Sequence, residues 1–300
     1  MANAVETSLT TSTAEPGRTG RALRIGLAVL STPIGFIGVL LVSIIILTAL
    51  FAHQIAPYPP TAISVKERLA DPSLAHWLGT DQLGRDLLSR VIIGTRTAMS
   101  VALSALAIAL AAALPLGLVA GYGPRWLDAL LILLFDSFSS LPMIMLGLAL
   151  VVLLGAGVGT VILVIVIYCI PSYARLIRAQ TLSIKARDFI KAEQAMNASL
   201  PRILFVHLLP NVIGPLLILA CLDLSTIITL EAGLSFGLGV KPQIPSWGNI
   251  LSDGFAVIRN TPVPVIAGGL PLILATIGFT FFGEALRDAL DPRLSGRRMP

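Results

Sequence analysis

Residues 97–122 read TAMSVALSALAIALAAALPLGLVAGY, and no charged side chain interrupts them. As an α-helix, this run is long enough to cross the roughly 30 Å hydrocarbon core of a bilayer. The rest of the chain suits the same environment, because 55% of its 300 residues are hydrophobic, only 12% are charged and its mean hydropathy is +0.88. The sequence therefore predicts an all-α integral membrane protein.

Apolar runs on both sides of this stretch predict further spans. Pro142 is expected to kink the third span, and a cluster of glycines at 155, 157 and 159 separates it from the fourth. The six predicted transmembrane helices cover residues 34–51, 97–122, 127–154, 158–173, 212–231 and 263–283. They form one domain, residues 34–284, between a disordered N-terminal tail (1–33) and a C-terminal tail (285–300).

Lysine and arginine positions set the expected orientation. With a cytoplasmic N-terminus, 14 of the 21 basic residues lie inside, as the positive-inside rule favours. We expect a multi-pass protein of the cytoplasmic (inner or plasma) membrane with both tails in the cytoplasm. The basic residues flank apolar runs and form no single basic and aromatic face, which argues against a nucleic-acid partner.

Residues 185–211, KARDFIKAEQAMNASLPRILFVHLLPN, form the longest polar insert in the second half of the chain. An apolar stripe recurs there at helical spacing, comprising Phe189, Ala192, Ala195 and Met196. Asn197 interrupts the helix, and Pro201 can open a second short one, so a helix, turn, helix hairpin is predicted. From spacing alone, such a hairpin either docks on a partner protein or lies on the lipid interface.

This insert resembles the cytoplasmic EAA loop of binding-protein-dependent ABC importers. The residues aligned with that loop are Lys191, Ala192, Glu193, Asn197, Ala198, Ser199, His207, Leu209, Pro210 and Asn211. Lys191 replaces the usual acidic residue and Glu193 supplies an acid two positions later, about 200° further around a helix. The resemblance implies that the short helices fit a groove on an ATP-binding subunit and pass its closure to the membrane helices.

Two more stretches resemble C-type subunits of dipeptide and oligopeptide permeases: HWLGTDQLGRDLLSR (76–90) and EAGLSFGLGVKPQIPSWGNILSD (231–253). The chain also closes with ALRDALDPRL (285–294), typical of that branch. The residues singled out are Gly79 and Gly84 for turns, Asp81, Arg85, Asp86 and Arg90 for ion pairs, and Trp247 as an interfacial or packing anchor. Residues 76–90 either shield the outer rim of the bundle or take part directly in peptide passage.

Carboxylates in apolar runs are costly, at roughly 2.5–3.5 kcal/mol near a helix centre, so they mark functional positions or internal hydrogen bonds. Asp136 and Asp223 are candidates for a translocation path. For Asp136 the alternative is a structural hydrogen bond near Ser137 or Ser139. Glu231 is expected to mark the outer boundary of the membrane.

No phosphate-binding loop, His/Cys metal cluster or nucleophile elbow occurs in the sequence, and Cys169 and Cys221 lie apart in apolar runs. We therefore expect a transport subunit that is not an enzyme and binds no metal or cofactor of its own. The resemblance implies a type I ABC importer permease fold surrounded by membrane lipid. It also implies a second homologous membrane subunit, two ABC ATPase subunits that bind ATP and Mg²⁺, and an extracytoplasmic solute-binding protein.

The substrates implied by the resemblance are dipeptides or short oligopeptides. Related systems suggest nickel complexes or glutathione as alternatives. A secondary transporter driven by an ion gradient is a third hypothesis. It predicts internal inverted repeats and paired broken helices, and the sequence shows no convincing repeat.

Overall fold

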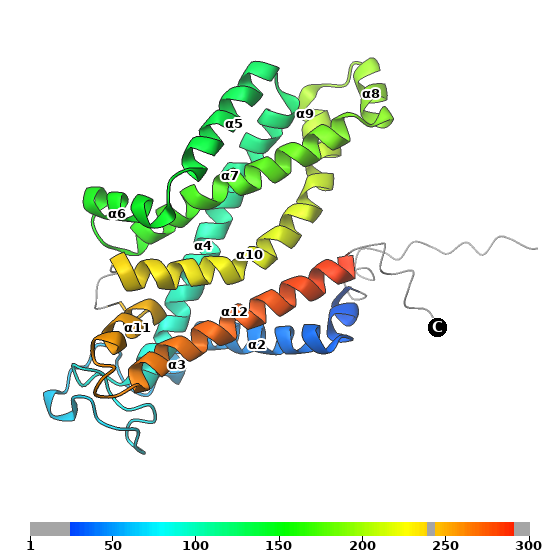
Figure 1. The fold of residues 1–300 in the computed structure, drawn as a ribbon. Helices are drawn as coiled ribbons and strands as arrows, with labels where there is room; N and C mark the ends of the chain where they lie inside the picture. The colour runs from blue at the N-terminus through cyan, green and yellow to red at the C-terminus, as the bar shows by residue number, and fades with distance from the viewer. Residues whose placement is uncertain (1–24, 239–243, 291–300) are drawn as a thin grey trace, which may run out of the picture.

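The computed structural model describes residues 25–238 and 244–290, and within these ranges the chain is helical and contains no β-strand. Figure 1 gives the labels used from here on. In chain order, the helices are α2 (Pro33–Leu50), α3 (Ala52–Ile55), the 3₁₀ turn η1 (Val65–Glu67), α4 (Leu87–Tyr122), α5 (Arg125–Ser139), α6 (Met143–Leu154), α7 (Val158–Lys185), α8 (Asp188–Ala195), α9 (Leu200–Arg202), the π-helical turn η2 (Ile203–Leu208), α10 (Leu209–Leu238), α11 (Trp247–Ala256) and α12 (Val263–Leu290).

Five helical stretches are long and apolar enough to cross a membrane: α2, α4, α7, the run from Leu200 to Gly237, and α12. The pair α5 and α6 makes a sixth if it is counted as one broken span. The two helices meet at an angle of 87°, so the kink predicted at Pro142 is a bend of nearly a right angle. Proline cannot donate the backbone hydrogen bond that would continue α5 into α6.

The helices extend beyond the predicted spans. At 1.5 Å per residue, the 36 residues of α4 measure about 54 Å, and the helix begins at Leu87, ten residues before the predicted start. Likewise α7 continues to Lys185 and α12 to Leu290. The charged ends of these helices therefore extend past the apolar region, because polar residues can continue an α-helix beyond its apolar run.

The predicted tails need two corrections. Residues 25–30 are helical, so disorder is wrong for that part of the predicted tail 1–33, and residues 1–24 lie outside the described residues. Residues 285–290 continue α12, whereas 291–300 also lie outside the described residues.

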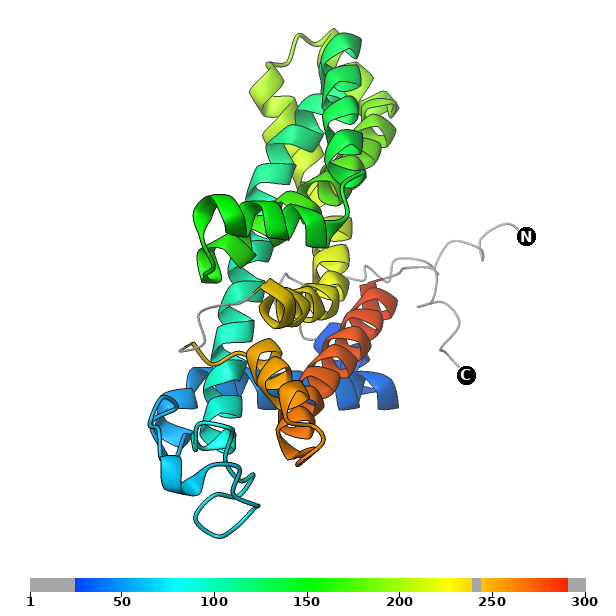
Figure 2. The same cartoon turned by 60° about the vertical axis from the view of Figure 1, so that its left-hand side comes forward.

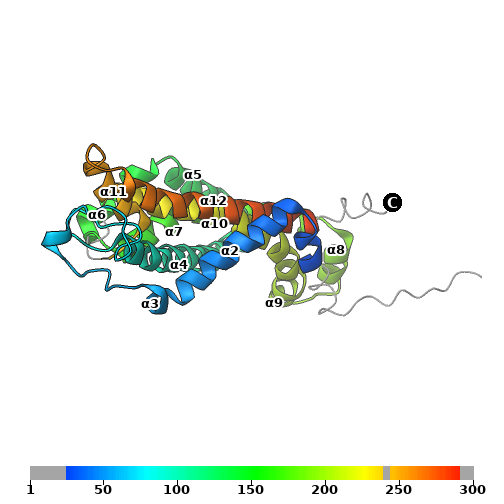
Figure 3. The ribbon, with the colours of Figure 1, turned by 90° about the horizontal axis from the view of Figure 1, so that it is seen from below.

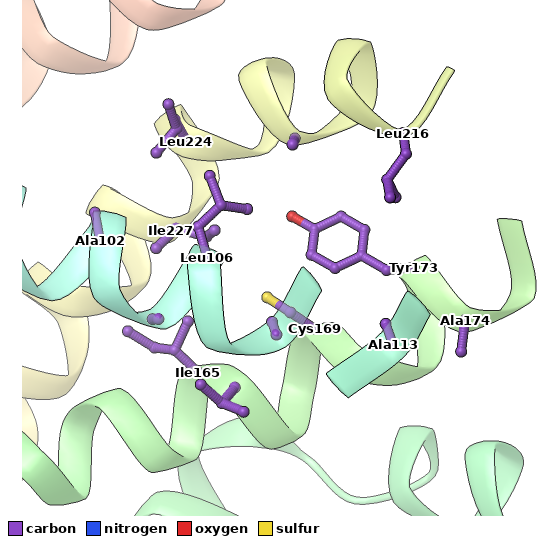
Figure 4. Packing of buried hydrophobic residues seen from close by; sticks show 14 of the residues in the cluster. Ala102, Leu106, Ala113, Ile165, Cys169, Tyr173, Ala174, Leu216, Leu224 and Ile227 are labelled. Carbon is purple, nitrogen blue, oxygen red and sulfur yellow. The ribbon is translucent and has the colours of Figure 1, made fainter. Parts of the chain in front are cut away.

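The centre of the bundle is the packing of α4 against α7. Small residues allow this approach, because a Cβ atom on Gly117 would lie 2.6 Å from the Cβ of Ile177, and one on Gly121 would lie 2.6 Å from the Cβ of Thr181. Tyr173 of α7 is fully buried beside them, and Figure 4 shows its ring between Leu216 of α10 and Cys169 of α7. Large apolar side chains elsewhere on the spans are exposed, as lipid or a partner subunit permits.

Two polar regions lie at opposite ends of this bundle. The 51–86 segment, between α2 and α4, lies beside α11 at one end, whereas α8 and α9 lie at the other (Figures 1 and 3). The start of α2 and the end of α12 lie toward the end that carries α8 (Figure 3). Figure 2 shows the lower part of the bundle, where α11 and α12 approach the 51–86 segment.

Candidate functional site

The 185–211 hairpin connects α7 to α10 at the far end of the bundle. Its first arm is α8, as predicted. The second arm is not a separate short helix, because α9, η2 and α10 follow one another without interruption from Leu200. Leu209 and Pro210 are consequently the first two residues of a helix that crosses the bundle, so this arm is a direct extension of a spanning helix.

The turn of the hairpin lies at Asn197, which has a positive φ of 59°. The Asn197 N–H donates to the Gln194 carbonyl and the Ala198 N–H to the Glu193 carbonyl, both at 3.0 Å. These two bonds form the Schellman motif that ends many helices, normally with glycine at the left-handed position. Asparagine is the side chain that best tolerates this conformation, so the turn predicted at Asn197 is present.

Residues of the predicted apolar stripe are exposed. Phe189 is 43% and Met196 is 71% exposed, and Ala192 and Ala195 face outward with them. The opposite side of α8 carries Ile190, which is fully buried in the core of the bundle. The hairpin thus has a buried side that fixes it to the bundle and an exposed apolar side, on which the ring of Phe189 lies 6.1 Å from the ring of His207.

The two charged positions that differ from the EAA pattern point in different directions. Lys191 is exposed and pairs with Asp188 at 3.0 Å. Glu193 faces the second arm, where its Oε1 lies 3.3 Å from Nε2 of His207 and its Oε2 lies 3.8 Å from Nε of Arg202. Glu193 therefore links the two arms.

Further bonds fix the hairpin to the end of α4 through Tyr122. Lys185 Nζ donates to the Tyr122 carbonyl at 2.9 Å and lies 4.7 Å from the centre of its ring. Gln194 Nε2 donates to the Tyr122 hydroxyl at 3.0 Å. The sequence marks Tyr122 only as the last residue of an uncharged run.

Ala198 is half-buried, and the exposed Ser199 precedes α9.

A cavity of about 360 Å³ opens between α7 and α10, and Asp223 lies on its wall. Tyr168, Ser172 and Arg175 of α7 provide other polar groups there. Asp136 does not line this cavity but pairs with Arg175, whose Nη1 lies 2.9 Å from its Oδ1. The cavity therefore carries an acidic group and a guanidinium that is paired with a second acid.

Arginines of α7 hold α5 in place. Besides Arg175 with Asp136, Arg178 makes two bonds to Asp128, at 2.5 and 2.7 Å. Arg175 also donates to Ser139 Oγ at 3.0 Å, so the partner of Asp136 is an arginine that it shares with Ser139, and not Ser137 or Ser139 as expected. Sequence reasoning missed these arginine partners, although two arginines at the end of a long apolar run were the available signal.

Glu231 lies inside the protein. It is fully buried in α10, where Ser235 Oγ donates to its Oε1 at 2.8 Å. Its position at the outer boundary of the membrane stays a prediction.

The 51–86 segment is built around the two predicted turn glycines. Gly79 and Gly84 have φ values of 71° and 72°. Asp86 caps α4, since its Oδ2 accepts from the Ser89 N–H at 2.7 Å, and its Oδ1 lies 2.8 Å from Nδ1 of His76. The end of the segment is thereby fixed on the first turn of α4.

A buried network of charges joins this segment to α11. Arg85 Nε donates to Asp81 at 2.6 Å, and Arg85 Nη2 donates to Asp253 of α11 at 3.0 Å. Arg90 Nε lies 3.5 Å from Oδ2 of Asp81, and Arg90 Nη2 lies 3.7 Å from Oδ2 of Asp253. The Arg90 side chain is only 1% exposed. Trp247 is also fully buried, with Nε1 donating to the Val91 carbonyl at 3.3 Å, so it is a packing anchor.

These features define a multi-pass membrane permease: a helical bundle with a central polar cavity and a hairpin that is hydrogen-bonded to its spanning helices. The chain belongs to the family of binding-protein-dependent transport system inner membrane components, whose model matches residues 113–296. It is the membrane component of such a system.

Curated relatives cover most of the chain. The dipeptide transport system permease protein DppC of Alkalihalophilus pseudofirmus is 36% identical over 87% of this chain and 86% of its own. The di/tripeptide transport system permease protein DppC of Pseudomonas aeruginosa is 38% identical over 86% and 87%. The glutathione transport system permease protein GsiD of Pectobacterium atrosepticum is 35% identical over 85% of both chains.

A solved structure supports the fold. An inward-facing structure of the MetNI methionine ABC transporter contains a chain that matches 68% of this chain and 97% of its own, with a TM-score of 0.56 and 21% identity. At this identity the match supports the predicted ABC importer permease fold alone.

Proposed function

We propose that this chain imports dipeptides or short oligopeptides across the cytoplasmic membrane as one subunit of an ATP-driven complex. The substrate class is inferred from two peptide permeases, which are 36% and 38% identical to this chain over at least 86% of its length. The proposed complex contains a second related permease, two ATPase subunits that bind ATP and Mg²⁺, and an extracytoplasmic binding protein. The chain itself contributes no catalytic group to ATP hydrolysis.

The ATPase docks, in this proposal, on the exposed stripe of α8 around Phe189 and Met196. Movement of α8 is transmitted because the hairpin is bonded to three spanning helices. Gln194 joins it to Tyr122 at the end of α4, Glu193 joins it to His207 before α10, and α7 enters it directly. Since α7 and α10 line the central cavity, displacing the hairpin changes the width of that cavity and alternates its access.

Both tails and the hairpin face the cytoplasm in this proposal. The distribution of Lys and Arg favours this orientation. The position of α8 at the same end as the start of α2 and the end of α12 supports one common side (Figure 3).

Asp223 and the Asp136–Arg175 pair are the proposed polar groups of the translocation path. A peptide is zwitterionic, so a path with one carboxylate and a paired guanidinium offers a weak contact to each end of the substrate. Weak contacts suit transport, because a substrate must leave the path as readily as it enters. Glutathione is the alternative substrate that the GsiD relative supports, and nickel complexes are a further one.

Reconstitution in liposomes tests the function. The chain is assembled with its neighbouring permease and ATPase subunits, and the binding protein is added empty or loaded with a dipeptide, a longer peptide, glutathione or a nickel complex. We expect ATPase activity and uptake to rise with the peptide-loaded forms. Stimulation only by glutathione or nickel would move the assignment to that substrate, and uptake driven by an ion gradient without ATP would reject it.

A further inference from the structure

An open groove lies between α2 and α4, away from the central cavity. It has a volume of about 230 Å³. Its lining consists of Ile46, Ala49 and Leu50 of α2 and Arg96, Met99, Ser100 and Leu103 of α4. Apart from Arg96 and Ser100, every lining side chain is apolar.

The groove reaches the membrane interface at the end that carries the 51–86 segment. Arg96 is the last charged residue before the uncharged run 97–122, and Leu50 is the last residue of α2. Leu50 and Leu103 are 64% and 50% exposed, so the walls of the groove face the surroundings of the bundle. Hydrocarbon therefore meets the walls, while the Arg96 guanidinium lies at the polar rim.

Arg96 differs from the other arginines of the spanning helices described above. Arg175 and Arg178 each pair with an aspartate, and Arg90 lies within 4 Å of two. Arg96 is exposed, and within residues 25–238 and 244–290 no carboxylate forms an ion pair with it. The Arg96 guanidinium is therefore available to bind an anion at the polar rim of the groove.

We infer that this groove binds one anionic phospholipid, with its phosphate on Arg96 and an acyl chain along the apolar walls. The planar guanidinium matches two phosphate oxygens at once, which an ammonium does not. A lipid with net negative charge is favoured over a zwitterionic one, because a zwitterionic headgroup carries its own ammonium, which competes with Arg96 for the phosphate. The site is separate from the hairpin, the cavity and the buried charge network.

Native mass spectrometry of the full-length chain in its purified complex tests this site. The complex is titrated with phosphatidylglycerol or with phosphatidylethanolamine of the same chain length. We expect Arg96→Gln to weaken the tightest phosphatidylglycerol binding by about tenfold or more, the value of one charge-assisted hydrogen bond, and Arg96→Lys to weaken it less. Binding of phosphatidylethanolamine should change little.

Two further variants separate the parts of the proposal. Ser100→Phe keeps the charge but fills the groove, so it should also weaken phosphatidylglycerol binding. Arg259→Gln is the matched control, because Arg259 is an exposed arginine between α11 and α12, outside the groove. It should leave binding unchanged.

Four results would overturn the inference. Equal phosphatidylglycerol binding by the parent protein and Arg96→Gln would show that Arg96 does not bind the headgroup. If Arg259→Gln weakened binding as much as Arg96→Gln does, the effect would be one of general charge. Normal binding by Ser100→Phe would remove the acyl groove. Release of the second permease subunit by Arg96→Gln, with lipid binding intact, would make the groove a protein interface.

Discussion

Arg85 and Asp253, 168 residues apart in the chain, are joined by a hydrogen bond of 3.0 Å that fixes the 51–86 segment to α11. Asp253 is also the second of two carboxylates near the buried Arg90. Two arginines and two aspartates therefore lie in one network, and loss of one carboxylate leaves the buried positive charges under-compensated.

Replacing Asp253 with Asn should lower the free energy of unfolding of the purified protein by roughly 1–3 kcal/mol. The side chain of Asp253 is 28% exposed, so water recovers part of the lost interaction. Thermal unfolding in detergent measures the effect, with Asp71→Asn, an exposed carboxylate of the same segment, as control. Identical melting temperatures for Asp253→Asn and the parent would show that the network does not hold the segment.

Gly84→Ala should destabilise the protein far more than Gly155→Ala. Both glycines have positive φ, 72° and 85°, but a Cβ on Gly84 would collide with the backbone carbonyl of Ser64, whereas Gly155 has nothing within 4 Å. Gly155→Ala should cost about 1 kcal/mol from backbone strain, and Gly84→Ala about 3 kcal/mol or more. Thermal unfolding of the two variants gives the difference, and equal losses would contradict the close approach to Ser64.

Glu193→Gln should uncouple transport more than it destabilises the fold. The change removes the charge that links the two arms of the hairpin through His207, whereas the contact is partly exposed and contributes below about 1 kcal/mol to stability. In proteoliposomes, stimulation of the ATPase by loaded binding protein should fall severalfold. Asp188→Asn, which removes an exposed charge from the same helix, serves as control, and an equal fall there would remove the special role of Glu193.

Ala195→Asp should release the ATPase or abolish coupling. It places a charge in the exposed apolar stripe of α8, where docking would bury it without a partner. Recovery of the ATPase with the tagged permease, and transport by the same complex, measure the effect. Ala186→Asp adds the same charge at the base of the hairpin, outside the stripe, and should retain both; full recovery and transport by Ala195→Asp would reject the docking surface.

Local rules explain what the sequence predicted well. The uncharged runs identified the membrane helices, because the cost of charge in hydrocarbon is a property of each segment. The turn at Asn197 and the positive φ at Gly79 and Gly84 were also predictable, since they depend on the residue at the turn itself. Helix ends were less predictable, as Leu87 and Lys185 illustrate, because polar residues continue a helix as readily as they end one.

Partners distant in the chain were decided by tertiary structure. Asp136, Arg175 and Asp223 were visible as isolated charges, but only the packing of α5, α7 and α10 brings them to one region and pairs two of them. Glu193 likewise gains its role from the direction in which α8 packs, since burial of Ile190 turns Glu193 toward His207. The sequence by itself determined a membrane permease with a helical hairpin that turns at Asn197, because those properties reside in segments. The tertiary structure alone decided which charges are paired, because a pair depends on the approach of two segments.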